Sequence, residues 1–375
     1  MSEEHGNQIA LLDHHCHGVV TADLDRPWFE DLMTESPFPP PAGTTNFDSP
    51  VGLAVRRWCA PVLDLPAGCR PDEYLERRRE LGAVEANRRL LRATGSEALL
   101  VDTGYRSDAI TPPPALSELA AAPAHEVVRI EVVAEQVLAG AGDGAAYEAE
   151  LGPALEAASA DAVGLKSIVA YRGGFGFDPA APERDEVVRA ADAWLRRDDR
   201  SHLTDPVLLR SCLWTAAEIA RRRHIPIQFH AGFGDPDLTL HLADPSLLTG
   251  LIRRFAELPV DVTLLHCYPY QRQAGYLAAV FPNVYFDVGM SLNYTGPSAE
   301  TVLAEALEMA PFTKQLYSSD AFGLAELYLT GAVLFRRALD AVLGRWVAEG
   351  DCSPADAARI AALIASGNAR RVYGL

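Results

Sequence analysis

Two histidines near the amino terminus have the spacing of a metal-binding pair. His15 and His17 lie in Leu11-Leu-Asp-His-His-Cys-His-Gly18, which begins with apolar residues typical of a buried strand. Alternate residues of a strand point to the same side, so the two imidazoles face one way while His14 and Cys16 face the other. Two imidazoles at one strand end can chelate a single divalent cation. A chance histidine-rich strand end is the competing interpretation of this motif taken alone.

Three more metal-ligating side chains stand at the ends of later predicted strands. An example is Ile225-Pro-Ile-Gln-Phe, which directly precedes a histidine. A single histidine in such a place is more often a structural residue than a ligand. Four of the chain's ten histidines and one aspartate share this position, however. The joint pattern therefore predicts one metal site, built from His15, His17, His230, His266 and Asp320.

A divalent cation held by these side chains is suited to hydrolysis. It lowers the pKa of its bound water towards about 7 and so supplies hydroxide at neutral pH. Asp320 can take the proton of that water and deliver it to the leaving group. His266 can help to stabilise the oxyanion that forms on carbonyl attack. Zinc suits imidazoles with a carboxylate, and the residue types also allow manganese or iron.

Lys166 lies within an otherwise apolar predicted strand, Ala162–Val169. Burying a charged ammonium is unfavourable unless the group is paired, modified or deprotonated. An inward Lys166 could be carbamylated by CO₂ and bridge two metal ions, or could stay an amine that contacts the substrate or the aspartate. The alternative is an outward lysine that reaches solvent between helices. We expect the inward orientation.

Four polar residues near the predicted strand ends are candidates for substrate binding. Arg172 precedes two glycines, where its guanidinium could grip a carboxylate, with a structural ion pair as the alternative. Gln228 and Tyr268 share the strand parity of nearby predicted ligands. Asp235 could bind an amine or simply cap a turn. An arginine for a carboxylate and an aspartate for an amine would suit an amino-acid-like small molecule.

These residues need a scaffold that brings strand ends together. Short β-branched or Leu-rich runs alternate with helical segments such as Asp205–Arg223. The predicted strands are Ile9–His15, Ala98–Asp102, Val127–Val133, Ala162–Val169, Ile225–His230, Val262–His266, Asn283–Val288 and Lys314–Asp320. Eight strand–helix units predict an α/β fold, a (β/α)₈ TIM barrel with its active site at the C-terminal strand ends. No GxGxxG turn follows the first strand, which disfavours an open doubly wound sheet.

An unusually long connection separates the first two predicted strands. We predict a long helical insertion over residues 23–95, in which Pro27–Pro50 has the composition of a loop. Pro71–Thr94 has the apolar stripe of a helix, with Gly95 as its C-terminal cap. Because βα loops lie at the catalytic end of a barrel, the insertion is either a lid or a helical pair packed on the flank. The whole chain, residues 1–375, is predicted to be one barrel.

The composition excludes several classes of protein. The chain has 51 acidic and 33 basic residues and a net charge of −18, which argues against nucleic-acid binding. No run approaches the roughly 18 apolar residues that span a bilayer, and the acidic start lacks a secretory signal core. The six cysteines show no CxxC spacing, which favours reduced thiols. We expect a cytoplasmic enzyme with a small-molecule substrate and no nucleic-acid or membrane partner; a homo-oligomer is compatible with the sequence.

The complete pattern resembles the metal site of the amidohydrolase superfamily. The matching residues are His15, His17, Lys166, His230, His266 and Asp320. The closing segment Ser366–Leu375 resembles the GNAxRxxxL end of amidohydrolase-2 members. The resemblance implies a mononuclear or binuclear site in which His15, His17 and Asp320 hold the first metal. The two later histidines would hold a second metal or complete the first site, and a carbamylated lysine would bridge two metals.

Three segments more narrowly resemble the nodulin/FluG-type branch, namely Gly164–Arg172, Gln228–Asp235 and Leu265–Pro269. Members of that branch can occur fused to glutamine-synthetase-like domains. The resemblance implies hydrolysis of an amide C–N bond and favours γ-glutamyl-like or other carboxylate-bearing substrates.

Two other functions stay open. Amidohydrolase-2 relatives include metal-dependent decarboxylases with a similar ligand pattern, although a lysine at the carbamylation position favours hydrolysis. A sensor or scaffolding domain without turnover is expected to lose at least one ligand, whereas this chain keeps the complete set.

Overall fold

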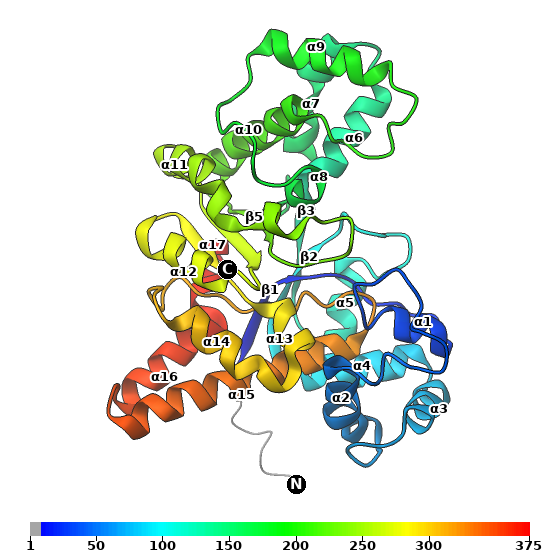
Figure 1. Cartoon of the computed structure of the whole chain (residues 1–375). Coiled ribbons are helices and arrows are strands. Elements are labelled where there is room, and N and C mark those ends of the chain that lie inside the picture. Colours follow the sequence, from blue (N-terminus) through cyan, green and yellow to red (C-terminus); the bar gives the residue numbers. More distant parts are fainter. Residues whose placement is uncertain (1–8) are drawn as a thin grey trace. The chain divides into compact units, whose positions relative to one another are not determined.

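The computed structural model describes residues 9–375 and divides into two compact units (Figure 1). Of the described residues, the first unit contains 9–125, together with Asp287–Arg371 and Leu375. The second contains Glu126–Phe286 and Val372–Gly374. Both units are built from parallel strands followed by helices, which is the α/β class that the sequence predicts.

The strands pair in parallel and in sequence order. In the first unit, β1 (Leu11–Cys16) pairs with β2 (Ser96–Asp102). In the second unit, each strand pairs with the next. These strands are β3 (Ala124–Arg129), β4 (Gly164–Ser167), β5 (Ile227–Ala231), β6 (Val262–His266) and β7 (Val284–Phe286). Every residue of β1 and of β4 to β7 is buried, as is typical of parallel strands covered on both faces.

The predicted eighth strand, Lys314–Asp320, is not a regular strand. The segment does run beside β1, where the amide of Asp320 donates to the carbonyl of His15 at 3.0 Å. The preceding amide, that of Ser319, donates instead to the side chain of Asp13 at 2.9 Å. Asp320 also has a positive φ of 51°. A side-chain acceptor and a left-handed residue therefore interrupt the ladder.

The third predicted strand, Val127–Val133, extends beyond the C-terminal end of the observed strand β3. β3 stops at Arg129, and α6 (Ile130–Gly140) begins with the next residue. The end of the β-branched run that suggested a strand forms the first turn of this helix, where Ile130 and Val133 are buried.

The other helices of the second unit follow the strands. They are α7 (Gly144–Ala158), α8 (Val169–Arg172), α9 (Arg184–Leu195), α10 (Pro206–Arg223), the 3₁₀-helices η3 (Leu240–Ala243) and η4 (Pro245–Leu248), α11 (Thr249–Glu257) and α12 (Gln271–Val280). The prediction for α10 is confirmed to within a residue, because Asp205 caps it by accepting hydrogen bonds from the amides of Val207 and Leu208.

In the first unit, a series of short helices connects β1 to β2. They are α1 (Arg26–Asp31), α2 (Pro50–Ala54), the π-helix η1 (Val55–Cys59), the 3₁₀-helix η2 (Ala60–Leu63), α3 (Pro71–Leu81) and α4 (Ala83–Ala93). The single helix predicted over Pro71–Thr94 is thus wrong. Gly82, with φ 76° and ψ 150°, separates α3 from α4, and a glycine adopts this conformation without the steric penalty of a Cβ.

The remaining helices belong largely to the first unit. They are α5 (Pro113–Ala120), α13 (Gly289–Thr295), the 3₁₀-helix η5 (Gly296–Ser298), α14 (Ala299–Leu307), α15 (Ala325–Glu349), α16 (Pro354–Ala362), the π-helix η6 (Leu363–Gly367) and the C-terminal α17 (Asn368–Tyr373). Within residues 9–375, no helix combines the length and the apolar character needed to cross a membrane.

One hydrophobic core holds the first unit together. Phe29, Tyr74 and Leu90, from the connection between β1 and β2, pack in one cluster with Leu99 of β2 and Tyr328 of α15. Each of these side chains is at most 1% exposed. The connection is therefore part of the core and not a surface appendage.

Candidate metal centre

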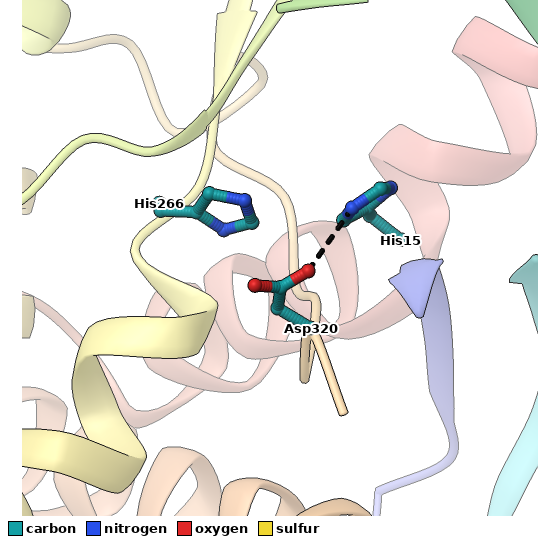
Figure 2. Close-up of side chains that lie close together, drawn as sticks. All are labelled: His15, His266 and Asp320. Carbon is teal, nitrogen blue, oxygen red and sulfur yellow. Dashed lines mark ion pairs between the residues drawn. The ribbon is translucent and has the colours of Figure 1, made fainter. Parts of the chain in front are cut away.

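Four side chains gather at the end of β1 and form what we call the β1 cluster: His15, His17, Asp102 and Asp320. The Nε2 atom of His15 lies 3.0 Å from Oδ1 of Asp320 (Figure 2), and Nε2 of His17 lies 3.6 Å from the same oxygen. Ligand atoms of His15, His17 and Asp102 lie within 4.8 Å of one another. Within the first unit, the structure thus brings together the three ligands that the sequence predicts there.

The alternation along β1 is confirmed by the neighbour of His15. His14 points away from the β1 cluster, and its Nε2 lies 3.0 Å from the carboxylate of Asp287. The hydroxyl of Ser318 donates to the same carboxylate at 2.8 Å. His14 is therefore held by its own buried partner.

Backbone carbonyls orient His17. Its Nδ1 lies 3.1 Å from the carbonyl oxygen of Asp102, and its own carbonyl accepts a hydrogen bond from the hydroxyl of Tyr328. Ligand histidines commonly donate one ring N–H to such an acceptor, which fixes the ring and leaves the other nitrogen for the metal. This arrangement leaves Nε2 of His17 directed at Asp320.

The carboxylate of Asp320 is positioned by an uncommon backbone conformation. A φ of 51° is sparsely populated by residues other than glycine, although aspartate tolerates it better than most. The amide and hydroxyl of the preceding Ser319 both donate to Asp13. Burial raises the pKa of Asp13 to about 7, and these hydrogen bonds oppose the rise. The buried Asp13 thus anchors the turn that presents Asp320.

Asp102 was not among the predicted ligands. It lies at the C-terminal end of β2, which is the same position in the strand that led us to the other candidates. Its carboxylate accepts the amide of Gly104 at 2.8 Å and lies beside His15 and His17. The sequence signal was present, because Ala98–Asp102 was already a predicted strand.

The second unit brings together the other two predicted ligands, which we call the histidine pair. The ring centroids of His230 and His266 are 4.8 Å apart. The register of β5 and β6 pairs His230 with Leu265, so these two side chains share one face of the sheet. If β6 stayed regular, the next residue, His266, would point to the opposite face, away from His230. A left-handed backbone at His266, with φ 68°, redirects its side chain. Strand parity alone does not predict this orientation.

The turn after β5 depends on a glycine. Gly232 has φ 81°, and a Cβ there would lie 2.3 Å from the carbonyl oxygen of Tyr268. We expect Gly232→Ala to lower the free energy of unfolding by about 2–4 kcal/mol, from left-handed strain plus the clash. Gly43 is a matched control, since it has the same φ of 81° but open space around it. Urea unfolding should show that Gly43→Ala lowers the free energy of unfolding by only about 1–2 kcal/mol. If both variants lost the same free energy, the close contact between position 232 and the carbonyl oxygen of Tyr268 would not matter.

Lys166 is buried in β4, with 2% of its surface exposed. Its register partners are Arg129 of β3 and Gln228 of β5. This burial is inconsistent with a lysine that reaches solvent between helices. The next residue, Ser167, donates its hydroxyl to the buried Glu131, whose pKa is raised by burial.

Two of the candidate substrate-binding residues have structural partners. Nη2 of Arg172 lies 3.3 Å from Glu135, which is the ion pair considered as the alternative. The carboxylate of Asp235 accepts the amide of Asp237 at 3.0 Å and so caps a turn. Partial burial raises the pKa of Asp235.

The other two candidates pack against aromatic residues. Gln228 is fully buried, and its Nε2 donates to the hydroxyl of Tyr373 at 2.8 Å. The ring of Tyr268 meets that of Phe233 edge-on, with centroids 6.0 Å apart. The amide of Gln228 is therefore engaged by the C-terminal helix α17.

The donor atoms fit a divalent metal ion. The β1 cluster offers two imidazoles and two carboxylates, and the histidine pair offers two more imidazoles. Nitrogen and oxygen ligands of this kind suit zinc, manganese or iron. All four histidines are buried, with at most 7% of each residue exposed.

A family model described as amidohydrolase matches residues 108–375. Over 224 residues, the chain is 35% identical to the protein FluG of Emericella nidulans, a match that covers 57% of this chain. The chain spans about a quarter of that curated relative, because the match covers 26% of FluG.

Solved structures share the fold. A protein from Lactobacillus casei, provisionally assigned as a metal-dependent hydrolase, is 28% identical, with a TM-score of 0.87 over 98% of this chain and 96% of its own. A uronate isomerase from Thermotoga maritima is 12% identical, with a TM-score of 0.64 over 97% of this chain and 94% of its own. This second likeness concerns the fold alone.

The family model covers most of the chain, and the relatives agree with it. These findings support an enzyme of the metal-dependent type, built on the α/β fold that the sequence predicts. The chain belongs to the amidohydrolase family.

Proposed function

We propose that the chain is a metal-dependent hydrolase that cleaves an amide C–N bond in a small, carboxylate-bearing molecule, such as a γ-glutamyl-like amide. The observation that carries the proposal is the β1 cluster, in which His15 and His17 both approach one oxygen of Asp320. A carboxylate held this way can serve as a ligand and as a proton carrier. The side chain of Asp320 is 12% exposed, which leaves it accessible to water.

The β1 cluster and the histidine pair are the two proposed sets of ligands, each within its own unit. His15, His17 and Asp320 would hold a first divalent ion, zinc by preference for this donor set. His230 and His266 would hold a second ion or complete the first site. A carbamylated Lys166 would bridge if two ions are present. Family membership and the buried donor atoms support this assignment.

The proposed mechanism gives each side chain a defined task. When bound, the metal ion supplies a water of lowered pKa and polarises the scissile carbonyl. The carboxylate of Asp320 takes the proton from the attacking water and passes it to the departing amine nitrogen. His15 and His17 keep that carboxylate in place. His266 stabilises the negative charge that develops on the carbonyl oxygen.

Arg172 is the proposed contact for a substrate carboxylate. Its Nη2 is paired with Glu135, whereas its Nε is buried and makes no hydrogen bond within residues 9–375. A guanidinium with a spare donor can bind a second carboxylate. Tyr268 is proposed to line the substrate site. For Gln228 and Asp235, whose polar atoms are engaged by Tyr373 and by a turn, we propose packing and turn roles.

The insertion over residues 23–95 is proposed as a fixed wall and not as a moving lid. Its residues Phe29 and Tyr74 are fully buried in the core of the first unit. Arg78 of α3 makes a 2.8 Å ion pair with Glu326 of α15, and both side chains are at most 4% exposed. Segments that open usually have few buried contacts, so this packing supports the flank-packed alternative.

We expect the purified chain to carry one or two divalent ions and to hydrolyse amides. Metal content would be measured by plasma mass spectrometry. A library of γ-glutamyl and N-acyl amino acid amides would be screened for release of amine together with carboxylate. Treatment with a chelator should remove the activity, and added zinc should restore it.

Two outcomes of this screen would contradict the proposal. Release of CO₂ from aromatic β-carboxylates, without cleavage of any amide, would identify a decarboxylase. A preparation that never binds zinc, manganese or iron would indicate a non-catalytic domain. Esters are screened as the comparison class. A hydrolase built for C–N bonds needs a proton donor, because an amine is a poor leaving group.

A further inference from the structure

A pocket lies in the first unit, and none of the residues assigned to the metal centre lines it. Its volume is about 580 Å³, within the range of roughly 300–1,000 Å³ that is typical of small-molecule sites. One wall is the end of α2 and the π-helix η1, and the other is formed by η5, the start of α14 and the middle of α15. We call it the Trp58 pocket.

Three arginines line the Trp58 pocket: Arg56, Arg57 and Arg337. None of them forms an ion pair with a carboxylate in the part of the chain that the structure describes. Glu300, the acidic residue of the lining, is already paired with Arg345 at 2.7 Å. Acidic residues outnumber basic ones by 51 to 33 in this chain. Three guanidiniums left without carboxylates around one hollow therefore indicate a site for an anion.

Arg56 also presents an unsatisfied donor. Its Nε is shielded from solvent and has no hydrogen-bond partner among residues 9–375. Buried N–H groups are nearly always paired in folded proteins. A carboxylate or phosphate oxygen of a ligand would supply the missing acceptor, and a charge-assisted bond of this kind is stronger than a neutral one.

An aromatic side chain lies among these cations. The guanidinium carbons of Arg57 and Arg337 lie 5.1 and 4.9 Å from the centroid of the Trp58 ring. Cations over an indole face are attracted to it, which holds both arginines and the ring in place. Leu53 and Leu334 add apolar surface to the lining. The pocket thus offers positive charge beside a flat apolar surface.

Local backbone features bring the two walls together. The π-helix places Arg56, Arg57 and Trp58 on consecutive positions of one widened turn, and such turns are frequent at functional sites. On the other wall, Gly296 has φ 48°, and a Cβ there would lie 2.9 Å from Cβ of Pro50. Glycine at this position permits the close approach of α2 and η5.

We propose that the Trp58 pocket is a second binding site, which takes a planar organic anion with a carboxylate or phosphate group. The guanidiniums of Arg56 and Arg337 bind the anionic group, and Trp58 with its apolar neighbours contacts the planar part. The site is separate from the metal centre, and binding there requires no bound metal.

Calorimetric titration with phenyl phosphate, benzoate and inorganic phosphate tests this assignment. Phenyl phosphate or benzoate should bind saturably to the intact chain, and whichever binds more tightly identifies the anionic group. Arg56→Gln and Arg337→Gln should each raise the Kd by about tenfold or more, the effect of one lost charge-assisted hydrogen bond. Arg88→Gln, an exposed arginine of α4 outside the pocket, should leave the Kd unchanged.

A second variant separates the two parts of the ligand. Trp58→Leu should weaken binding of phenyl phosphate more than binding of inorganic phosphate, because only phenyl phosphate also loses the contact with the ring. Each titration is repeated after the metal has been removed with a chelator. Binding that persists belongs to the Trp58 pocket, whatever the outcome for amide hydrolysis.

Three results would overturn the proposal. The first is an absence of saturable binding of both aromatic anions at millimolar concentration. The second is a Kd that is unaffected by Arg56→Gln and Arg337→Gln in variants whose circular dichroism and thermal unfolding match those of the parent chain. The third is a dimer, detected by sedimentation, that Arg337→Gln dissociates, since a second copy would then cover the pocket.

Discussion

Replacing Asp320 with asparagine should lower kcat/KM for amide hydrolysis by about a thousandfold or more while the chain stays folded. Loss of a general acid/base alone typically lowers the rate by about 10²–10⁴-fold, and the same change weakens a proposed metal ligand. The substitution keeps the size of the side chain. Asparagine also tolerates the left-handed φ of 51° at this position, so the turn should survive.

The measurement pairs steady-state kinetics with metal content and thermal unfolding. An exposed aspartate of α15, Asp340, gives the matched control, because Asp340→Asn removes the same charge far along the helix from the β1 cluster. It should leave kcat/KM within about twofold, as surface substitutions usually do. A kcat/KM for Asp320→Asn within tenfold of the parent enzyme would falsify the assigned role.

The parts of the metal centre that follow from local rules could be predicted from the sequence. The period of two along a strand is a local property, and it correctly separated His15 and His17 from His14. The same reasoning could have found Asp102, since its place at the end of β2 was known. An aspartate at a strand end commonly caps the following turn, as Asp102 does by accepting the amide of Gly104, so its type and position alone do not indicate a ligand.

Other features depend on contacts that the sequence does not reveal. The left-handed backbone at His266 overrides strand parity, and nothing in Val262-Thr-Leu-Leu announces it. Glu135, the partner of Arg172, lies 37 residues earlier on another helix. A glycine within a helical pattern, such as Gly82, costs only about 1 kcal/mol relative to alanine, so the composition alone did not indicate the break between α3 and α4.

The fold class was easier to predict than its irregularities. Alternating strands and helices indicate a parallel α/β fold whatever the details of each loop. The eighth strand was predicted from composition, but its hydrogen bonds are interrupted where Asp13 replaces a backbone acceptor for Ser319. The departures from regular structure at Asp320 and His266 fall on proposed ligands, as is common for backbone strain at functional sites.

Removing the buried cation of α3 should strongly destabilise the first unit. The guanidinium of Arg78 donates to Glu326 at 2.8 Å and to Asn87 at 3.0 Å, and Asn87 in turn donates to the carbonyl of Val20 at 2.8 Å. This network ties the connection between β1 and β2 to α15 and to the backbone that follows His17. We expect Arg78→Leu to lower the free energy of unfolding by about 3–5 kcal/mol, because it leaves the carboxylate of Glu326 buried without its cation.

A double-mutant cycle, measured by denaturant unfolding, separates the free-energy contribution of the Arg78–Glu326 ion pair from that of general packing. Arg78→Leu and Glu326→Gln together should cost less than the sum of the single changes, because the double variant buries no lone charge. Arg88→Leu removes an exposed arginine that is paired with Glu85 on α4, and it should cost no more than about 1 kcal/mol. A loss below 1 kcal/mol for Arg78→Leu would mean that the ion pair does not hold the insertion in place. The insertion would then be held in place by its hydrophobic core contacts, such as those of Phe29 and Tyr74.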